Sequence, residues 1–193
     1  MKKTLLFIFV VLFISCNQET TFSEVNVNDR YSIMIPTYMK ACNDIQKDAS
    51  LQYQNLDKDV YVIVIDEKKV TMQDYDLNFN LDSYYNSISS QGFSESIKNG
   101  KISIPGRQEI NGNKALIADI TGKLEENEVY YKLAVVETPY EFYQIMTWTR
   151  AAHREKLEKD MITIIESFKE LPHPKEELPA PKPSDSLIIR QPW

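Results

Sequence analysis

Short stretches in which hydrophobic and polar residues alternate run through most of the chain, and this period of two predicts half-buried β-strands. The first two stretches, at 22–27 and 31–35, flank a turn at 28–29 and predict a β-hairpin. Further strands are expected at 49–53, 101–104, 108–110, 114–121, 128–136 and 141–149. The pair Asn111-Gly112 is the strongest hairpin-turn signal between them. The pattern therefore predicts an antiparallel sheet.

One strand lacks the alternation. Residues 60–65 are apolar at six consecutive positions, and Val and Ile dominate the run. A strand that is apolar on both sides needs cover on both of its faces. This run therefore predicts a layered sandwich rather than an open sheet with one face in water.

Two segments show the spacing of amphipathic helices, with apolar residues three or four positions apart. The first stripe consists of Leu81, Tyr84, Tyr85 and Ile88. The second consists of Leu157, Met161, Ile164, Ile165 and Phe168. Gly92 ends the first helix and Pro172 prevents continuation of the second, whereas the polar residues 66–80 are expected to form a long loop. Strands with one helix between them and one after them predict an α+β fold.

The first sixteen residues have the pattern of an export signal. A basic head at 1–4 precedes ten apolar residues at 5–14, which are too few to span a bilayer as a retained helix of about 20 residues. The next residues, Ser15 and Cys16, resemble the lipobox of bacterial lipoproteins, although Phe13 replaces the usual Leu. The resemblance implies cleavage between Ser15 and Cys16 and diacylation of the Cys16 sulfur. The alternative is a soluble secreted protein in which a cysteine follows the signal sequence by chance.

The net charge of the chain determines whether a membrane surface would attract or repel it. The net charge is −6, and removal of Lys2 and Lys3 with the signal peptide leaves 20 basic against 28 acidic residues, or −8. An acidic body argues against nucleic acid as a partner and repels anionic headgroups, so the acyl chains must hold it to the membrane. Five extended residues, 17–21, reach at most ~17 Å, which keeps the domain close to the bilayer.

Several short segments together resemble the PsbP-like group, which includes bacterial DcrB-like envelope proteins and a eukaryotic Ran-binding import factor. These segments are YSIMIP at 31–36, ASL at 49–51, VI at 64–65 and IIESF at 164–168. The resemblance covers residues 22–170 and implies an antiparallel β-sheet sandwiched between helices. It also implies a function by docking onto other proteins. The expected organisation is therefore a signal peptide at 1–15, a lipidated linker at 16–21, the PsbP-like domain at 22–170 and a tail at 171–193.

The chain offers little for catalysis or metal binding. It contains two histidines and two cysteines, no Gly-x-Ser-x-Gly elbow and no glycine-rich phosphate loop. His153 is interpreted as a solvated helix residue rather than a general base, and His173 lies between two prolines. Cys42 is interpreted as a small buried residue rather than a reactive thiol. We therefore expect no enzyme activity, cofactor or metal; a hydrolase that uses scattered carboxylates is the alternative.

Aromatic residues crowd the last two expected strands and favour a recognition surface. The candidate interaction residues are Tyr130, Tyr140, Tyr143, Trp148 and, at the end of the chain, Trp193. The alternative is that the rings on one face of each strand belong to the core, as expected for Tyr131, which shares a face with Val129 and Leu133.

The tail at 171–193 contains six of the nine prolines and is expected to be extended. Its apolar tip at 187–193 either tolerates deletion or docks onto a sheet edge. Taken together, the sequence predicts a lipoprotein of the bacterial cell envelope, on the periplasmic or outer-membrane face. Its expected role is to bind an unidentified envelope protein without catalysis.

Overall fold

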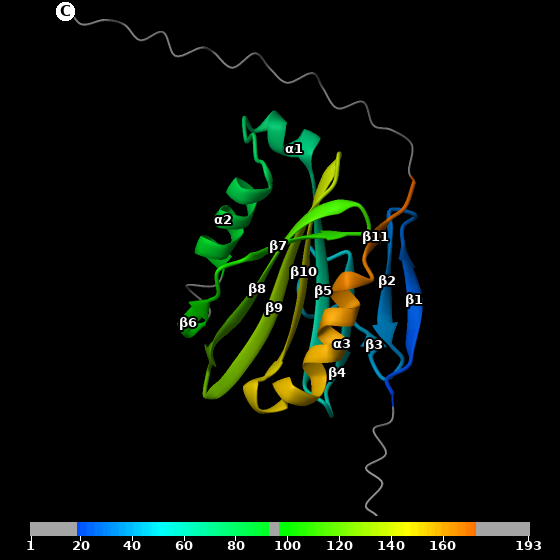
Figure 1. Cartoon of the computed structure of the whole chain (residues 1–193), viewed down its shortest axis with the longest axis vertical. Helices are drawn as coiled ribbons and strands as arrows, with labels where there is room; N and C mark the ends of the chain where they lie inside the picture. Colours follow the sequence, from blue (N-terminus) through cyan, green and yellow to red (C-terminus); the bar gives the residue numbers. More distant parts are fainter. Residues whose placement is uncertain (1–18, 93–96, 173–193) are drawn as a thin grey trace, which may run out of the picture.

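The computed structural model describes residues 19–92 and 97–172, and its main element is an eight-stranded antiparallel sheet (Figure 1). The strand order is β3-β4-β5-β10-β9-β8-β6, and β7 also pairs with β8. The strands are β3 (Lys40–Ala41), β4 (Leu51–Asn55), β5 (Val60–Lys68), β6 (Lys98–Ile102), β7 (Gly106–Ile110), β8 (Asn113–Leu124), β9 (Asn127–Glu137) and β10 (Glu141–Arg150). The predicted antiparallel sheet is therefore confirmed.

A smaller sheet has the order β1-β2-β11, with β1 (Phe22–Val27), β2 (Tyr31–Pro36) and β11 (Lys169–Glu170). The β1–β2 hairpin turns at Asn28 and Asp29, whose φ angles are 49° and 55°. Asn and Asp tolerate this left-handed region better than other residues with a side chain, so the turn residues fit the hairpin. The hairpin predicted at the start of the domain is confirmed.

Three α-helices accompany the sheets in the described residues: α1 (Lys69–Asp74), α2 (Leu81–Gly92) and α3 (Arg154–Glu166), which follows a 3₁₀ turn. The positions of α2 and α3 agree with their apolar stripes. The long loop expected at 66–80 is wrong in its first half, because β5 continues to Lys68 and α1 follows directly. No residue of α1 is buried, so its sequence has no apolar stripe that could have predicted it.

The small sheet and α3 cover one face of the eight-stranded sheet (Figure 1). Aromatic rings join the three elements, because Tyr31 of β2 and Tyr143 of β10 meet edge to face at 5.4 Å between ring centroids. Phe168, just after α3, lies 4.7 Å from Tyr143 and 5.5 Å from Tyr31. All three side chains are fully buried, so they form the centre of the larger core.

The opposite face of the large sheet packs against α2, on the far side of the molecule from α3 (Figure 1). Leu81, Tyr84 and Tyr85 of α2 are buried there, and Tyr84 stacks on Phe142 of β10 at 4.3 Å. The sheet is thus enclosed between helices, as the α+β sandwich prediction requires.

The cover on the α2 side is incomplete over β5. Val60, Val62 and Val64 point toward α3 and are fully buried. On the other face Ile63 is buried, whereas Tyr61 and Ile65 are only half-buried. The physical reason is that α2 packs mainly on β8 and β9, two strands that lie beyond β10 from β5. The prediction that 60–65 is covered on both faces is therefore fully met on one face only.

Candidate functional site

A groove of about 380 Å³ lies where the α2-side face is left uncovered, at the end of the sheet where β5 begins and β10 ends. Its volume is within the range of small-ligand sites. We call it the aromatic groove, and the lining residues used below are Asp59, Tyr61, Leu124, Val129, Trp148 and Arg150.

The floor of the aromatic groove is formed by stacked rings from adjacent strands. Trp148 of β10 lies directly opposite Tyr61 of β5 on one side and Tyr131 of β9 on the other. The Trp148 ring lies 5.0 Å from Tyr61 and 5.5 Å from Tyr131 between centroids, with interplanar angles of 10° and 20°. Directly opposed residues on neighbouring strands are about 5 Å apart, so the strand pairing itself produces this stack. Tyr131 is buried and the other two rings are half-buried, so the stack extends the core into the groove.

The rim of the aromatic groove contains an ion pair that includes Asp59, in the turn between β4 and β5. Arg150 Nη2 lies 2.5 Å from Asp59 Oδ2, and His153 Nδ1 lies 3.9 Å from the same oxygen. Partial burial, followed by the nearby Asp59 carboxylate, raises the pKa of Tyr61. The Tyr61 hydroxyl therefore remains protonated at neutral pH and is able to donate a hydrogen bond. The groove thus combines a flat apolar floor with polar groups at its edge.

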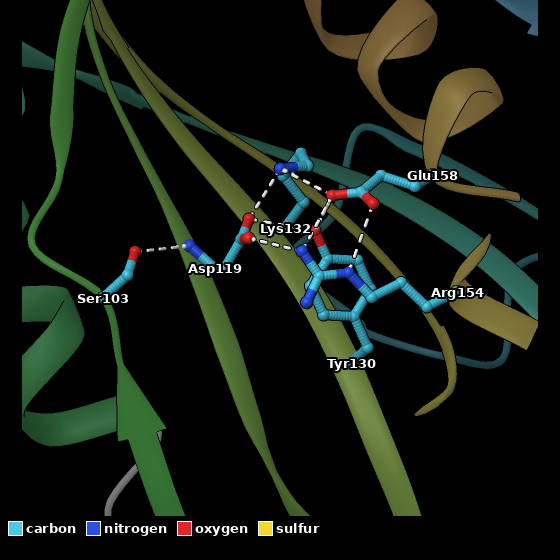
Figure 2. Close-up of polar contacts among 6 residues, drawn as sticks. All are labelled: Ser103, Asp119, Tyr130, Lys132, Arg154 and Glu158. Atoms are coloured by element: carbon cyan, nitrogen blue, oxygen red, sulfur yellow. Dashed lines mark hydrogen bonds and ion pairs between the residues drawn. The ribbon is translucent and has the colours of Figure 1, made fainter. Parts of the chain in front are cut away.

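A second cluster of polar side chains lies on the α3 side of the sheet (Figure 2). Lys132 Nζ donates to Asp119 Oδ1 at 2.6 Å, and the Tyr130 hydroxyl lies 2.8 Å from Glu158 Oε1. Arg154 Nη2 reaches both acids, at 3.1 Å from Asp119 Oδ2 and 3.0 Å from Glu158 Oε1. Two acids and two bases therefore compensate one another and connect α3 to β8 and β9.

The two carboxylates of this polar cluster, Asp119 and Glu158, can be assessed as a hydrolytic pair. The hydrogen bond from Arg154, opposed by burial, lowers the pKa of Glu158 below its ordinary value. Burial, followed by the hydrogen bond to Glu158, raises the pKa of Tyr130. A general acid at neutral pH needs a raised carboxyl pKa, so the direction at Glu158 is unfavourable for that role.

The aromatic residues predicted as an interaction surface occupy different positions. Trp148 is half-buried in the aromatic groove, and Tyr140 is half-buried in the β9–β10 turn at the opposite end of the sheet. Tyr130 and Tyr143 have no exposed area, so their assignment to a surface is wrong. Both project toward α3, where the helix and the small sheet cover them completely. Trp193, like Ser15 and Cys16, lies outside the described residues.

The sequence did not predict Tyr61 as a groove residue, or the support that Tyr131 gives to Trp148. Tyr61 is the one aromatic residue in the apolar run at 60–65, a signal that was available in the sequence. Tyr131 was expected in the core and is indeed buried, but it also supports the stack under Trp148. Its role depends on the pairing of β9 with β10.

The other residues considered for chemistry are placed as follows. Cys42 is half-buried, and desolvation together with Asp44 raises the pKa of its thiol, which disfavours the thiolate. His153 is half-exposed, and its Nδ1 lies 3.2 Å from the Lys58 carbonyl oxygen. Across residues 19–92 and 97–172, no group of three or more His, Cys, Asp or Glu side chains is arranged to hold a metal ion. In the same residues, no helix has both the length and the apolar character needed to cross a membrane.

Neither a protein-family model nor a curated protein sequence matches this chain. Among solved structures, it is similar to the cyanobacterial PsbP protein (CyanoP) of Synechocystis sp. PCC 6803, with a TM-score of 0.58 and 12% identity over 80% of this chain and 95% of that one. It is also similar to LpqN of Mycobacterium tuberculosis, described as involved in cell envelope biogenesis, with a TM-score of 0.56 and 11% identity over 79% and 91% of the two chains. The protein therefore has a PsbP-like α+β fold. This agrees with the resemblance found in the sequence.

Proposed function

We propose that this chain is a lipid-anchored, non-catalytic binding module of the bacterial cell envelope that recognises a partner protein at the aromatic groove. The observation that carries the proposal is the exposed part of the ring stack. Trp148 and Tyr61 are half-buried on the part of the α2-side face that α2 leaves uncovered, and Arg150 borders them. Trp, Tyr and Arg are the residue types most enriched at the energetic centres of protein interfaces.

The envelope location is supported by two independent considerations. The lipobox-like residues Ser15 and Cys16 follow an export-signal pattern, so the mature chain would begin with an acylated cysteine. One of the structurally similar proteins, LpqN, is described as involved in cell envelope biogenesis. Membrane attachment can be checked by labelling cells with a fatty-acid probe. We expect label on the natural protein and none on Cys16→Ala, which should be recovered uncleaved or soluble; label retained by Cys16→Ala would contradict the anchor.

The non-catalytic part of the proposal is supported by the polar cluster on the α3 side. Its carboxylates, Asp119 and Glu158, are each bonded to a basic side chain, and the pKa of Glu158 is lowered rather than raised. A hydrolase based on this pair would need at least one carboxyl that is protonated at neutral pH. The cluster instead consists of ion pairs and hydrogen bonds that attach α3 to the sheet.

Recognition at the groove can be tested by site-specific photocrosslinking in cells. A photoreactive amino acid at Leu124, on the groove rim, should capture a discrete protein, whereas the same group at Glu155, exposed on α3, should not. The Leu124 adduct should disappear when Trp148→Ala is added, because the substitution removes the largest ring of the floor. Thermal unfolding of the Trp148→Ala variant serves as the control that the fold is retained. Identical adducts from both positions, or an adduct that persists in Trp148→Ala, would contradict the proposal.

A further inference from the structure

We infer that the end of the domain containing the aromatic groove lies against the lipid bilayer, so that the groove opens at the membrane surface. The occupant of this end is the bilayer itself, with neutral or zwitterionic headgroups. The inference rests on the acylation of Cys16 and deepens the proposed function, because it restricts the partner of the groove to molecules at the membrane surface.

The first step is the direction of β1 relative to the large sheet. Arg30, in the turn that connects β1 to β2, forms ion pairs with Asp66 and Glu141. These two acids lie near the end of β5 and at the start of β10, which is the end of the sheet opposite the groove. The other end of the hairpin, where β1 begins at Phe22, therefore lies toward the groove end. Figure 1 shows this end below, with the start of β1 and the β4–β5 and β8–β9 turns.

The second step is a chain of contacts from the start of the domain to the groove rim. The hydroxyl of Thr21 hydrogen-bonds the hydroxyl of Thr37 at 2.7 Å. The next residue, Tyr38, accepts a hydrogen bond from Asn55 Nδ2 at its carbonyl, and Lys58 Nζ lies 4.7 Å from the centre of its ring. Asn55 ends β4, and Lys58 belongs to the β4–β5 connection, which also contains Asp59 of the groove rim. The chain thus joins the domain at the same end of the sheet as the groove.

The third step compares lengths. Residues 17–21 span at most ~17 Å between Cys16 and the start of β1. β8 alone contains 12 residues, so the sheet is roughly 40 Å long in the strand direction. Because the tether is much shorter than the sheet, acyl chains on Cys16 hold the groove end near the bilayer and keep the opposite end away from it.

The chemistry of the groove end fits a lipid surface. The two turns that border the groove present Leu56 and Leu124, whose side chains are 67% and 41% exposed. Between them lie Trp148 and Tyr61, and such rings favour the boundary between apolar and wet surroundings. The charged residues within these two turns are Asp57, Lys58, Asp59, Glu125 and Glu126. Acidic residues outnumber basic ones there, so the contact is apolar and anionic headgroups weaken it.

The inference is tested with the full acylated protein in phosphatidylcholine vesicles that contain brominated phosphatidylcholine, a short-range quencher of tryptophan fluorescence. The substitution Trp193→Phe leaves Trp148 as the one emitter, and we expect the brominated lipid to quench it. The matched control carries Trp148→Phe, Trp193→Phe and Tyr75→Trp. Tyr75 is 75% exposed and follows α1, at the opposite end of the sheet, so no quenching by the lipid is expected there.

Two further measurements identify the contact. The double substitution Leu56→Ser and Leu124→Ser changes exposed side chains only, so the fold is kept, and most of the quenching of Trp148 should be lost. The control Leu77→Ser removes a leucine that is 47% exposed near α1, and it should leave the quenching unchanged. Replacing part of the lipid with anionic phosphatidylglycerol should reduce the quenching in the parent protein.

The outcomes separate this inference from the proposed function. Equal quenching at both reporter positions, or no quenching of Trp148 while Cys16 is acylated, overturns the inference and leaves the groove as a proposed protein-binding site. A protein without acyl label that does not bind the vesicles overturns the proposed anchor, and the inference with it. Quenching of Trp148 that survives the double leucine substitution also contradicts the inference, because the contact would not involve the turns.

Discussion

The two faces of the eight-stranded sheet follow the same alternation of side chains but receive different covers. On one face, α3 and the small sheet enclose Tyr130, Tyr143 and Ile145 completely. On the other, α2 packs over β8 and β9, and Trp148 and Tyr61 remain half-buried at the groove. Aromatic residues on the α3 face therefore belong to the core, whereas those at the groove reach the surface, although their sequence surroundings are similar. Substitutions on the α3 face should cost mainly stability, and substitutions at the groove should cost mainly binding.

The largest difference is expected between two phenylalanines. Phe168→Ala should lower the free energy of unfolding by about 3–5 kcal/mol, because the ring is fully buried between Tyr31 and Tyr143. Phe79→Ala, on the α2 side, should cost clearly less, because Phe79 is only partly buried. Urea denaturation of both variants measures the difference. Equal losses would mean that the two faces are equally important to the core.

A smaller effect is expected in the polar cluster on the α3 face. Lys132→Met should lower the free energy of unfolding by about 1–3 kcal/mol, because it removes the hydrogen bond to Asp119 and leaves Arg154 as the one basic partner of that partly buried acid, beside the Tyr130 hydroxyl. Lys132→Arg keeps the charge and serves as the control in the same denaturation experiment. A Lys132→Met variant as stable as the parent would show that the cluster contributes nothing to holding α3.

The same cluster predicts a dependence on pH. Arg154 lowers the pKa of Glu158 below its ordinary value of 4.5. A carboxyl with a lower pKa in the folded state adds stability above its unfolded pKa and loses it as the pH falls through the folded pKa. The free energy of unfolding should therefore decrease below about pH 4.5, and it should decrease less steeply in Glu158→Gln. Denaturation at a series of acidic pH values tests this; parallel curves would exclude Glu158 as a source of the dependence.

The smallest effect on stability is expected at the groove rim. Leu124→Ser should change the free energy of unfolding by less than about 0.5 kcal/mol, because the side chain is already 41% exposed. In the same variant, crosslinking from another rim position such as Asn127 should decrease. A large loss of stability would place Leu124 in the core and remove the contrast between the two faces.

Much of the fold could be predicted because its elements have one buried side. The stripes of α2 and α3 and the alternation in β8–β10 follow directly from that burial. Helix α1 could not be predicted in this way, because none of its residues is buried. The groove could not be predicted either, since its floor depends on β5 and β9 pairing with either side of β10. Sequence alternation separates Tyr130 from Tyr131, but the extent of the cover on each face decides which aromatic residues reach the surface.

The small sheet has a consequence for how the chain matures. β11 pairs Lys169 with Ser32 and Glu170 with Tyr31, so the last described strand completes a sheet begun by the first two. If the chain is exported amino end first, the β1–β2 hairpin emerges early, whereas its third strand emerges only after nearly all of the domain. Contacts between distant parts of a sequence form slowly, and incomplete sheets expose unpaired edges. In that case folding is completed only after translocation, and the unpaired hairpin is the segment that chaperones and proteases on the far side of the membrane meet first.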